Sequence, residues 1–344
     1  MRPIFITSVT KQTNASPVDM TKIKRFIKDW MLPLAMIVGA SAYLIYKQIP
    51  SLAPAGPFLY RTVAFLQPAL LFCLLFLTFC RISPKDMRPR KWHLWLLLFQ
   101  TLGFILLAIT TIFLKGAHSA VLIESAMLMI ICPTATAASV ITGKLGGDMP
   151  GLTTYLILIN LVTALVVPLF VPIIHPAQDT TFVVAFSMIM AKVFPLLICP
   201  CILAWIVRFT MPKLHRKIVR HENLPFNLWS VGLMLAILMT TRSIVHSDVP
   251  ASYQIGIAVV SLVCCILQFA CGKLIGKRYG ASITAGQALG QKNTVFAIWM
   301  GYTFMTPVTS IAGGFYSIWH NVFNSWQLYR KRKDEEKGIF PVQE

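Results

Sequence analysis

The sequence predicts an all-α polytopic membrane protein with ten transmembrane helices, arranged as two inverted five-helix repeats. Three observations support this prediction. The chain is 56% hydrophobic and 12% charged, with a mean hydropathy of +0.69, whereas globular domains carry about 25% charged residues. Ten apolar runs are long enough to cross a bilayer as helices. Lysine and arginine gather in the connections on one side of these runs, as in cytoplasmic loops.

The ten predicted spans are apolar runs of about 20 residues. In chain order they cover residues 30–48, 62–82, 92–114, 119–143, 151–173, 181–207, 226–245, 253–272, 281–302 and 306–328. The short connections leave no room for a domain outside the membrane. Each half, 30–174 and 175–329, contains an odd number of spans, so if the halves are repeats the second is inverted. Residues 1–29 and 330–344 remain as tails.

The positive residues set the orientation. One side of the predicted spans carries 25 Lys and Arg residues, and the other carries only Lys47, Arg61, Lys115 and Arg242. Because basic residues favour the cytoplasmic side, we expect both tails in the cytoplasm and the protein in the cell membrane, plasma or inner. The N-terminal tail lacks the apolar region and cleavage site of a signal peptide.

The same patterns exclude other classes. The net charge of +19 lies in loops between apolar runs, so nucleic acid is not an expected partner. The eight cysteines have no metal-ligand spacing and lie in or at the ends of the spans, where cysteine acts as a small hydrophobe. We therefore expect no metal site, no disulfide framework and no obligatory protein partner. The bilayer is the expected environment.

Two spans, the fourth of each half, contain polar interruptions. The first is Cys132–Ser139, where Pro133 removes a backbone donor and opens the helix. The second is Gly286–Thr294. At bilayer depth such breaks persist only where protein or a water-filled cavity receives the freed backbone groups. Two interrupted spans at corresponding positions indicate the binding site of a secondary transporter. Each follows a span with a single glutamine, Gln100 or Gln268.

Short polar side chains at the breaks are the candidate site residues. They are Thr134, Thr136 and Ser139 at the first break and Asn293 and Thr294 at the second. Each alone is also compatible with an ordinary interhelical hydrogen bond worth about 0.6 kcal/mol. Their clustering at the two breaks favours a binding site.

Four charged residues cannot be placed in the loops or tails. Arg242 lies near the outer end of its span and can extend to the interface. Glu124 either caps the outer end of its helix or lines a vestibule. Lys192 lies mid-span, where a charge costs roughly 2.5–3.5 kcal/mol, so we expect it to face a cavity or a partner. Helix packing and substrate binding remain equally open for Lys192.

The fourth, Lys292, lies inside the second break beside Gln291, Asn293 and Thr294. No carboxylate is near it in the sequence. Amide oxygens, opened carbonyls and hydroxyls are the ligands that a sodium ion would use. We therefore expect the ammonium either to occupy the place of a coupling cation or to contact an anionic substrate.

Several stretches resemble the bile acid:sodium symporter family. They are Phe76–Asp86, the region from Cys132-Pro133 to Asp148, the second break, and Tyr316–Asn321, so the resemblance extends over about residues 30–328. It implies ten helices, of which 1, 2, 6 and 7 form a panel domain and 3–5 and 8–10 a core domain. It also implies that discontinuous helices 4 and 9 cross at their unwound centres. Substrate would bind beside that crossing, and sodium behind it.

The chain departs from the family pattern at the sodium ligands. Ala138 and Ser139 stand where the family has Ser and Asn, and Leu152 and Leu156 replace two hydroxyl residues. Anchoring on Asn293-Thr294 puts Ala288 at the family glutamate and Lys292 at a glutamine. If one inserted residue is allowed, Gln287 and Gln291 take the family positions of the glutamate and the glutamine instead. The family glutamate is then still missing. Gln100 matches the family glutamine of helix 3. We group Lys292, Gln291, Gln287 and Gln100 as a surrogate for the coupling ion.

The sequence thus predicts a non-enzymatic transporter of a small organic anion, bile-acid-like, with a carboxylate or sulfonate. Transport would be sodium-independent, either facilitated or coupled to protons through Lys292, and no cofactor is expected. One alternative is a sodium-coupled symporter with altered ligands. Another is a membrane sensor that binds the ligand without moving it. The spans offer no nucleophile–base pair, acidic metal-binding pair or histidine cluster for an intramembrane enzyme.

Overall fold

The structure is a computed structural model that describes residues 31–114, 119–176, 181–221, 224–246 and 250–336. The predicted tail 1–29 lies outside these residues. The described chain forms helices and one isolated backbone bridge. The helices are α2 (Met31–Gln48), η1 (Pro50–Ala55), α3 (Gly56–Cys80), η2 (Pro84–Asp86), α4 (Lys91–Phe113), α5 (Ala120–Ile131), α6 (Ala138–Lys144), α7 (Met149–Ile174), α8 (Phe182–Thr210), α9 (Pro212–Arg220), α10 (Leu224–Val245), α11 (Ala251–Lys277), α12 (Ser282–Gly290), α13 (Thr294–Phe304) and α14 (Ile311–Glu336).

The predicted all-helical class is confirmed, and the protein is a multi-pass membrane protein. Among the described residues, six helices are long and apolar enough to cross a membrane: Pro50–Cys80, Lys91–Phe113, Met149–Ile174, Phe182–Thr210, Asn227–Val245 and Ala251–Lys277. Two shorter apolar helices, α5 and α13, are each one half of an interrupted segment.

Two stretches expected outside helices are helical. The sequence 208–220, predicted as a loop, contains the end of α8 and the whole of α9. Pro212 stands at the start of α9, where its missing N–H costs nothing and its fixed φ suits a helix. The predicted C-terminal tail begins at 330, but α14 continues to Glu336. An apolar run shows which residues cross the membrane, but a helix can continue beyond that run. Charged turns at the end of a helix are therefore missed when spans are predicted from apolarity.

Side-chain caps position the helices around the breaks. The Asp148 carboxylate accepts a hydrogen bond from the Gly151 N–H at 3.1 Å, at the start of α7. The same carboxylate lies 2.6 Å from the Arg90 guanidinium, which precedes α4. At the second break the Asn293 side chain accepts from the Phe296 N–H at 3.2 Å and starts α13. Asparagine and aspartate are preferred caps because their oxygens satisfy N–H groups with no intrahelical partner.

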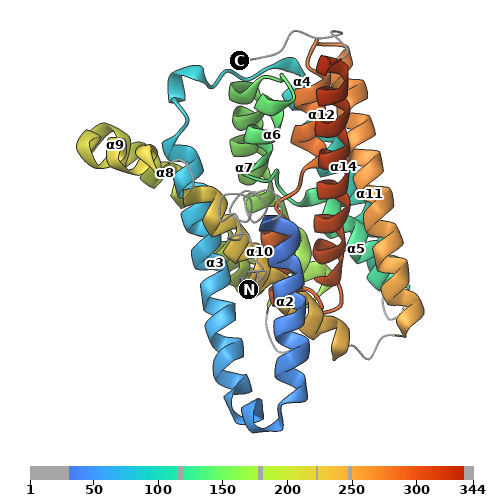
Figure 1. Cartoon of the computed structure of the whole chain (residues 1–344). Helices are drawn as coiled ribbons and strands as arrows, with labels where there is room; N and C mark the ends of the chain where they lie inside the picture. The colour runs from blue at the N-terminus through green and yellow to red at the C-terminus, as the bar shows by residue number, and fades with distance from the viewer. Residues whose placement is uncertain (1–30, 115–118, 177–180, 222–223, 247–249, 337–344) are drawn as a thin grey trace, which may run out of the picture.

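Two sets of helices can be followed in Figure 1, and an extensive contact between α7 and α8 joins them. α2 packs on α10, and α3 packs on α8 and α10. In the other group, α11 packs against α5, α12 and α14, and α4 against α5 and α7. α13 contacts both groups, since it touches α3 and α10 as well as α14. The broken segments therefore lie inside the second group, and one half-helix faces the first group.

Candidate functional site

The two predicted breaks meet and pair with each other. α5 ends at Ile131 and α6 begins at Ala138, while α12 ends at Gly290 and α13 begins at Thr294. Thr134 and Lys292 form an antiparallel bridge. The Ala135 N–H donates to the Gln291 carbonyl and the Asn293 N–H donates to the Pro133 carbonyl, each at 2.8 Å. We call residues 132–137 and 291–293 the crossing. Each opened strand supplies the hydrogen bonds that the other lacks.

The second break is shorter than predicted. Gly286–Gly290 still belongs to α12, so only residues 291–293 are extended between the two half-helices. Glycine is permissive in a helix as well as in a loop, and the packing of α12 against α11 keeps this stretch helical.

The C-terminal end of α5 has an unusually complete set of side-chain donors. A helix end leaves four carbonyls without intrahelical partners. Here Gln268 Nε2 donates to the Met129 carbonyl at 3.2 Å, and the Thr163 hydroxyl donates to the Ile131 carbonyl at 3.1 Å. Gln100 Nε2 donates to the carbonyls of Ile130, at 2.7 Å, and Cys132, at 3.3 Å. These donors come from α4, α7 and α11.

Lys292 completes this set. Its side chain is fully buried, with 0% exposed, and Nζ lies 3.3 Å from the Ile130 carbonyl oxygen. No acidic side chain among the described residues forms an ion pair with it. The neighbouring titratable groups are the thiols of Cys132, Cys264 and Cys265. The ammonium thus sits at the negative end of the α5 dipole, where a cation is stabilised.

Two tyrosines hold the glutamines, and sequence reasoning assigned a site role to neither. The Tyr155 hydroxyl of α7 donates to Gln100 Oε1. In the second half, Gln268 Nε2 donates to the Tyr316 hydroxyl of α14 at 3.2 Å, and that hydroxyl donates to the Gly290 carbonyl at 2.8 Å. Both tyrosines are fully buried. Their distance from the breaks in the sequence hid this role, although each lies on the last full helix of its half.

The other predicted site residues divide between the crossing and its surroundings. Thr134 donates to the Ala288 carbonyl at 2.5 Å, and Thr294 is buried at the start of α13. Ser139 donates to the Thr136 carbonyl at 3.1 Å, a local contact at the start of α6 in which both residues are partly exposed.

The two further glutamines behave differently from Gln100. Gln287 Nε2 donates to Asn324 Oδ1 at 2.9 Å and so joins α12 to α14. Gln291 is 1% exposed, and neither polar atom of its side chain has a hydrogen-bond partner among the described residues.

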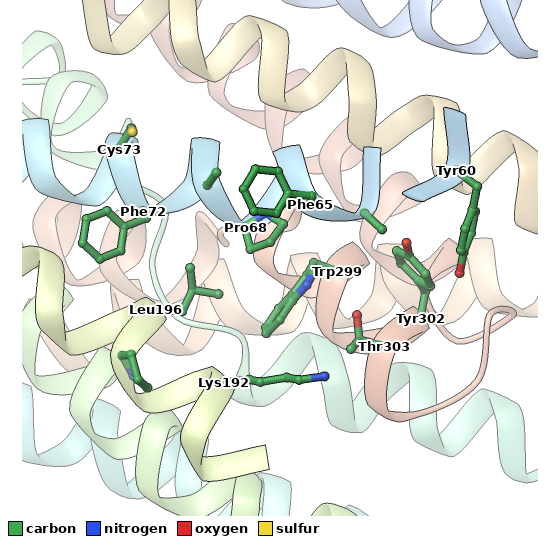
Figure 2. Close-up of a pocket in the computed structure, with 13 residues that line it drawn as sticks. Tyr60, Phe65, Pro68, Phe72, Cys73, Lys192, Leu196, Trp299, Tyr302 and Thr303 are labelled. Atoms are coloured by element: carbon green, nitrogen blue, oxygen red, sulfur yellow. The ribbon is translucent and has the colours of Figure 1, made fainter. Parts of the chain in front are cut away.

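Lys192 lies apart from the crossing, on the wall of a pocket of about 830 Å³ between α3, α8 and α13. The prediction that it faces a cavity is confirmed. Figure 2 shows its ammonium pointing toward Thr303 of α13. Nζ lies 5.6 Å from the centre of the Phe304 ring. The pocket is lined by Tyr60, Ala64, Phe65, Pro68, Ala69, Phe72, Cys73, Lys192, Pro195, Leu196, Trp299, Tyr302 and Thr303.

The aromatic lining of the pocket was missed because aromatic residues in apolar spans are usually lipid-facing or core. Trp299 and Tyr302 follow the crossing on α13 by five and eight residues counted from Thr294. Tyr60 of α3 lies 6.0 Å from Tyr302, ring centre to ring centre, and beneath the Arg242 guanidinium at 4.7 Å. Arg242 therefore has an aromatic partner within the protein.

Glu124 has a partner that was not predicted. Its Oε2 accepts from the Thr309 hydroxyl at 3.0 Å and lies 3.3 Å from His175 Nε2. It therefore connects α5 with the end of α7 and with the α13–α14 connection, and it is 7% exposed.

A comparison with known proteins identifies the family of the chain. A family model described as the Sodium Bile acid symporter family matches residues 68–248, which is more than half of the chain. A comparison with curated proteins returns no match. The matched region includes the first crossing strand, Gln100, Tyr155 and Lys192. The chain belongs to the sodium bile acid symporter family.

Proposed function

We propose that the protein is a secondary transporter that moves a small organic anion by alternating access, without sodium coupling. Family membership makes the chain a transporter and not an enzyme. The family description names a bile acid, which supports a bile-acid-like carboxylate or sulfonate as the substrate class. The single observation that carries sodium independence is the buried Lys292 ammonium at the end of α5.

The proposed architecture has ten spans in two inverted repeats, with both termini cytoplasmic in the cell membrane. The first repeat covers 30–174 and the second 175–329. α2, α3, α8 and α10 form the panel domain, and the remaining spans, including both broken ones, form the core domain. The Gln100–Tyr155 and Gln268–Tyr316 pairs support the repeat, because each joins the first and last full helices of one core half. These four side chains lie in the described ranges 31–114, 119–176 and 250–336.

Sodium is disfavoured by Coulomb repulsion. A sodium ion 4 Å from the ammonium would be repelled by about 4 kcal/mol at an effective dielectric constant of 20. The positions of the lost ligands offer no compensation, since Leu152 and Leu156 are fully buried among apolar side chains. We propose that residues in the crossing and beside it hold Lys292 where other members bind the ion. In the crossing these are Thr134, Gln291 and Asn293, and beside it they are Gln100 and Thr294.

The pocket is the proposed substrate site. Its walls belong to α3 and α8 on one side and α13 on the other, so a change in the relative position of the two groups would open or close it. Ligand sites are mostly apolar with a few polar groups that fix orientation. Lys192 would pair with the anionic group, while Phe65, Phe72 and Trp299 would contact the apolar body.

The test is uptake into proteoliposomes that hold the purified full-length protein. Radiolabelled taurocholate and simple aryl carboxylates and sulfonates would be supplied with an inward sodium gradient or an equal potassium gradient. We expect saturable uptake of at least one anion, at equal rates in the two salts. Sodium stimulation of more than about threefold would overturn the sodium-independent mechanism. Saturable binding with no uptake above protein-free liposomes would support the sensor alternative.

A further inference from the structure

α9 is the one described helix that extends sideways from the helical bundle, as Figure 1 shows at the end of α8. Its sequence is PKLHRKIVR, with four cations in nine residues. Lys213, Arg216, Lys217 and Arg220 are all exposed. None of them forms an ion pair with a described residue. The acidic residue nearest in sequence is Glu222, so the stretch remains strongly basic.

The four cations occupy one face of the helix. At 3.6 residues per turn, Arg216, Arg220, Lys213 and Lys217 fall within an arc of about 100°. His215 lies about 160–200° away from the two lysines, on the opposite face. Leu214, Ile218 and Val219 fill the arc around His215. The basic and apolar faces are therefore cleanly separated, which is the pattern of a helix at a membrane surface.

Contacts fix which face points inward. His215 Nε2 lies 2.7 Å from the Cys80 carbonyl at the end of α3, and Ile218 and Val219 pack against the hydrophobic core. The Arg81 guanidinium donates to the His221 carbonyl at 3.0 Å, immediately after α9. Arg208, in the last turn of α8, donates to the Ile82 carbonyl. With its apolar face held at the ends of α3 and α8, α9 presents its basic face away from the protein.

We propose that this basic face binds the phosphate headgroups of anionic lipids. The inference is independent of the substrate, but it rests on the proposed orientation, in which the ends of α3 and α8 lie at the cytoplasmic leaflet. Charge complementarity selects the partner, since the cytoplasmic leaflet carries anionic lipid. The exposed apolar side chains of Phe209, Met211 and Leu214 adjoin the basic face, as expected where acyl chains meet headgroups. The lipid contact would hold α3 and α8 at a fixed depth.

The experiment compares full-length protein in nanodiscs of phosphatidylcholine with increasing fractions of phosphatidylglycerol, using a fluorescent phosphatidylglycerol analogue as the probe. The test variant is Lys213→Gln/Arg216→Gln/Lys217→Gln/Arg220→Gln. The matched control is Arg88→Gln/Lys91→Gln/Lys277→Gln/Arg278→Gln, which removes four exposed cations from the ends of α4 and α11. Thermal unfolding in pure phosphatidylcholine verifies that both variants fold. Each surface cation contributes about fivefold to the affinity for anionic lipid.

We expect the unaltered protein and the control to enrich phosphatidylglycerol at least tenfold over phosphatidylcholine, and the α9 variant to lose this enrichment. Equal enrichment in all three proteins would overturn the proposal, as would equal loss in the control. Displacement of the probe by millimolar inorganic phosphate would also overturn it, because it would indicate an anion site and not a lipid site. Uptake measured on the same samples is a separate readout: failed uptake with intact lipid enrichment contradicts the transport proposal alone.

Discussion

Gln100 shows how one side chain can hold a broken helix open. Its amide donates to two carbonyls, those of Ile130 and Cys132, and its oxygen accepts from Tyr155. A buried carbonyl that loses its partner costs about 1–3 kcal/mol. Water cannot replace the lost donor at bilayer depth unless a cavity admits it.

Gln100→Leu is expected to destabilise the protein by about 2–4 kcal/mol. It leaves the Cys132 carbonyl and the Tyr155 hydroxyl unpaired, and the Ile130 carbonyl keeps Lys292 as its remaining donor. The control is Gln67→Leu. Gln67 is also fully buried, but neither polar atom of its side chain has a partner among the described residues, so its removal should be neutral or stabilising. Thermal unfolding of both variants in one detergent checks this, and equal losses of stability would contradict it.

Lys292 allows a test in which a single residue changes ion dependence. In Lys292→Glu a carboxylate replaces the ammonium beside the Ile130 carbonyl, and hard anionic oxygen is what an alkali cation needs. We expect anion uptake by this variant to become sodium-stimulated. Lys292→Met, which has similar length and no charge, should lose at least tenfold in uptake and stay indifferent to sodium. Sodium-insensitive uptake by a folded Glu variant would count against the surrogate role.

The residue types in the sequence predicted the residues of the crossing better than they predicted the side chains that pack around it. Thr134, Asn293 and Lys292 stand out because polar groups are costly in an apolar span. Tyr155 and Trp299 do not stand out, since tyrosine and tryptophan are also expected where a span meets the membrane interface. Ser139 and Gln287 satisfy a local turn and a neighbouring helix instead. Which polar residue faces which neighbour depends on helix rotation, and an apolar run carries little information about rotation.

At the scale of elements, the close contact of α11 and α12 depends on glycine. A Cβ added at Gly272 would lie 2.5 Å from the Ala285 carbonyl oxygen and 2.9 Å from the Gly286 Cα, both backbone atoms. Small residues at helix interfaces in membranes let backbones approach closely. α12 carries the second break, so its distance from α11 sets where Lys292 lies.

Gly272→Ala is therefore expected to cost about 1–3 kcal/mol, as overpacking does, and to weaken uptake. The matched change is Gly232→Ala on α10, where an added Cβ would come no closer than 3.9 Å to Leu74 or Val295. Alanine is favoured over glycine within a helix by roughly 0.5–1 kcal/mol, so this variant should be as stable as the unaltered protein or slightly more stable. Denaturation curves for the pair decide the point, and the reverse order would refute it.

The order and class of the helices could be predicted for two reasons. Apolar runs of about 20 residues mark the spans, and the basic residues gather in the connections on one side of those spans. Pro133 marks the first break directly. The second break contains no proline, and its position between Gly290 and Thr294 depends on pairing with residues 133–135, which lie far away in the sequence. α9 was not predicted because contacts with the ends of α3 and α8 stabilise it, and its own composition does not indicate a helix.

At the scale of the whole molecule, alternating access requires the two helix groups to move past each other across the pocket. Tyr60 of α3 and Tyr302 of α13 face each other there, with ring centres 6.0 Å apart. In a background without native cysteines, Tyr60→Cys/Tyr302→Cys joined by a short bis-methanethiosulfonate should stop uptake, and reduction should restore it. The physical reason is that the cross-link fixes α13 to a helix of the other group.

A second pair tests whether cross-linking alone is harmful. Tyr43 of α2 and His246, which follows α10, lie within one group, with ring centres 6.1 Å apart and a hydrogen bond of 3.1 Å. Tyr43→Cys/His246→Cys treated with the same reagent should keep uptake, because α2 and α10 are expected to move together. If both cross-links block uptake, or if neither does, the two groups are not the moving parts, and the pocket would have to open by a change within one of them.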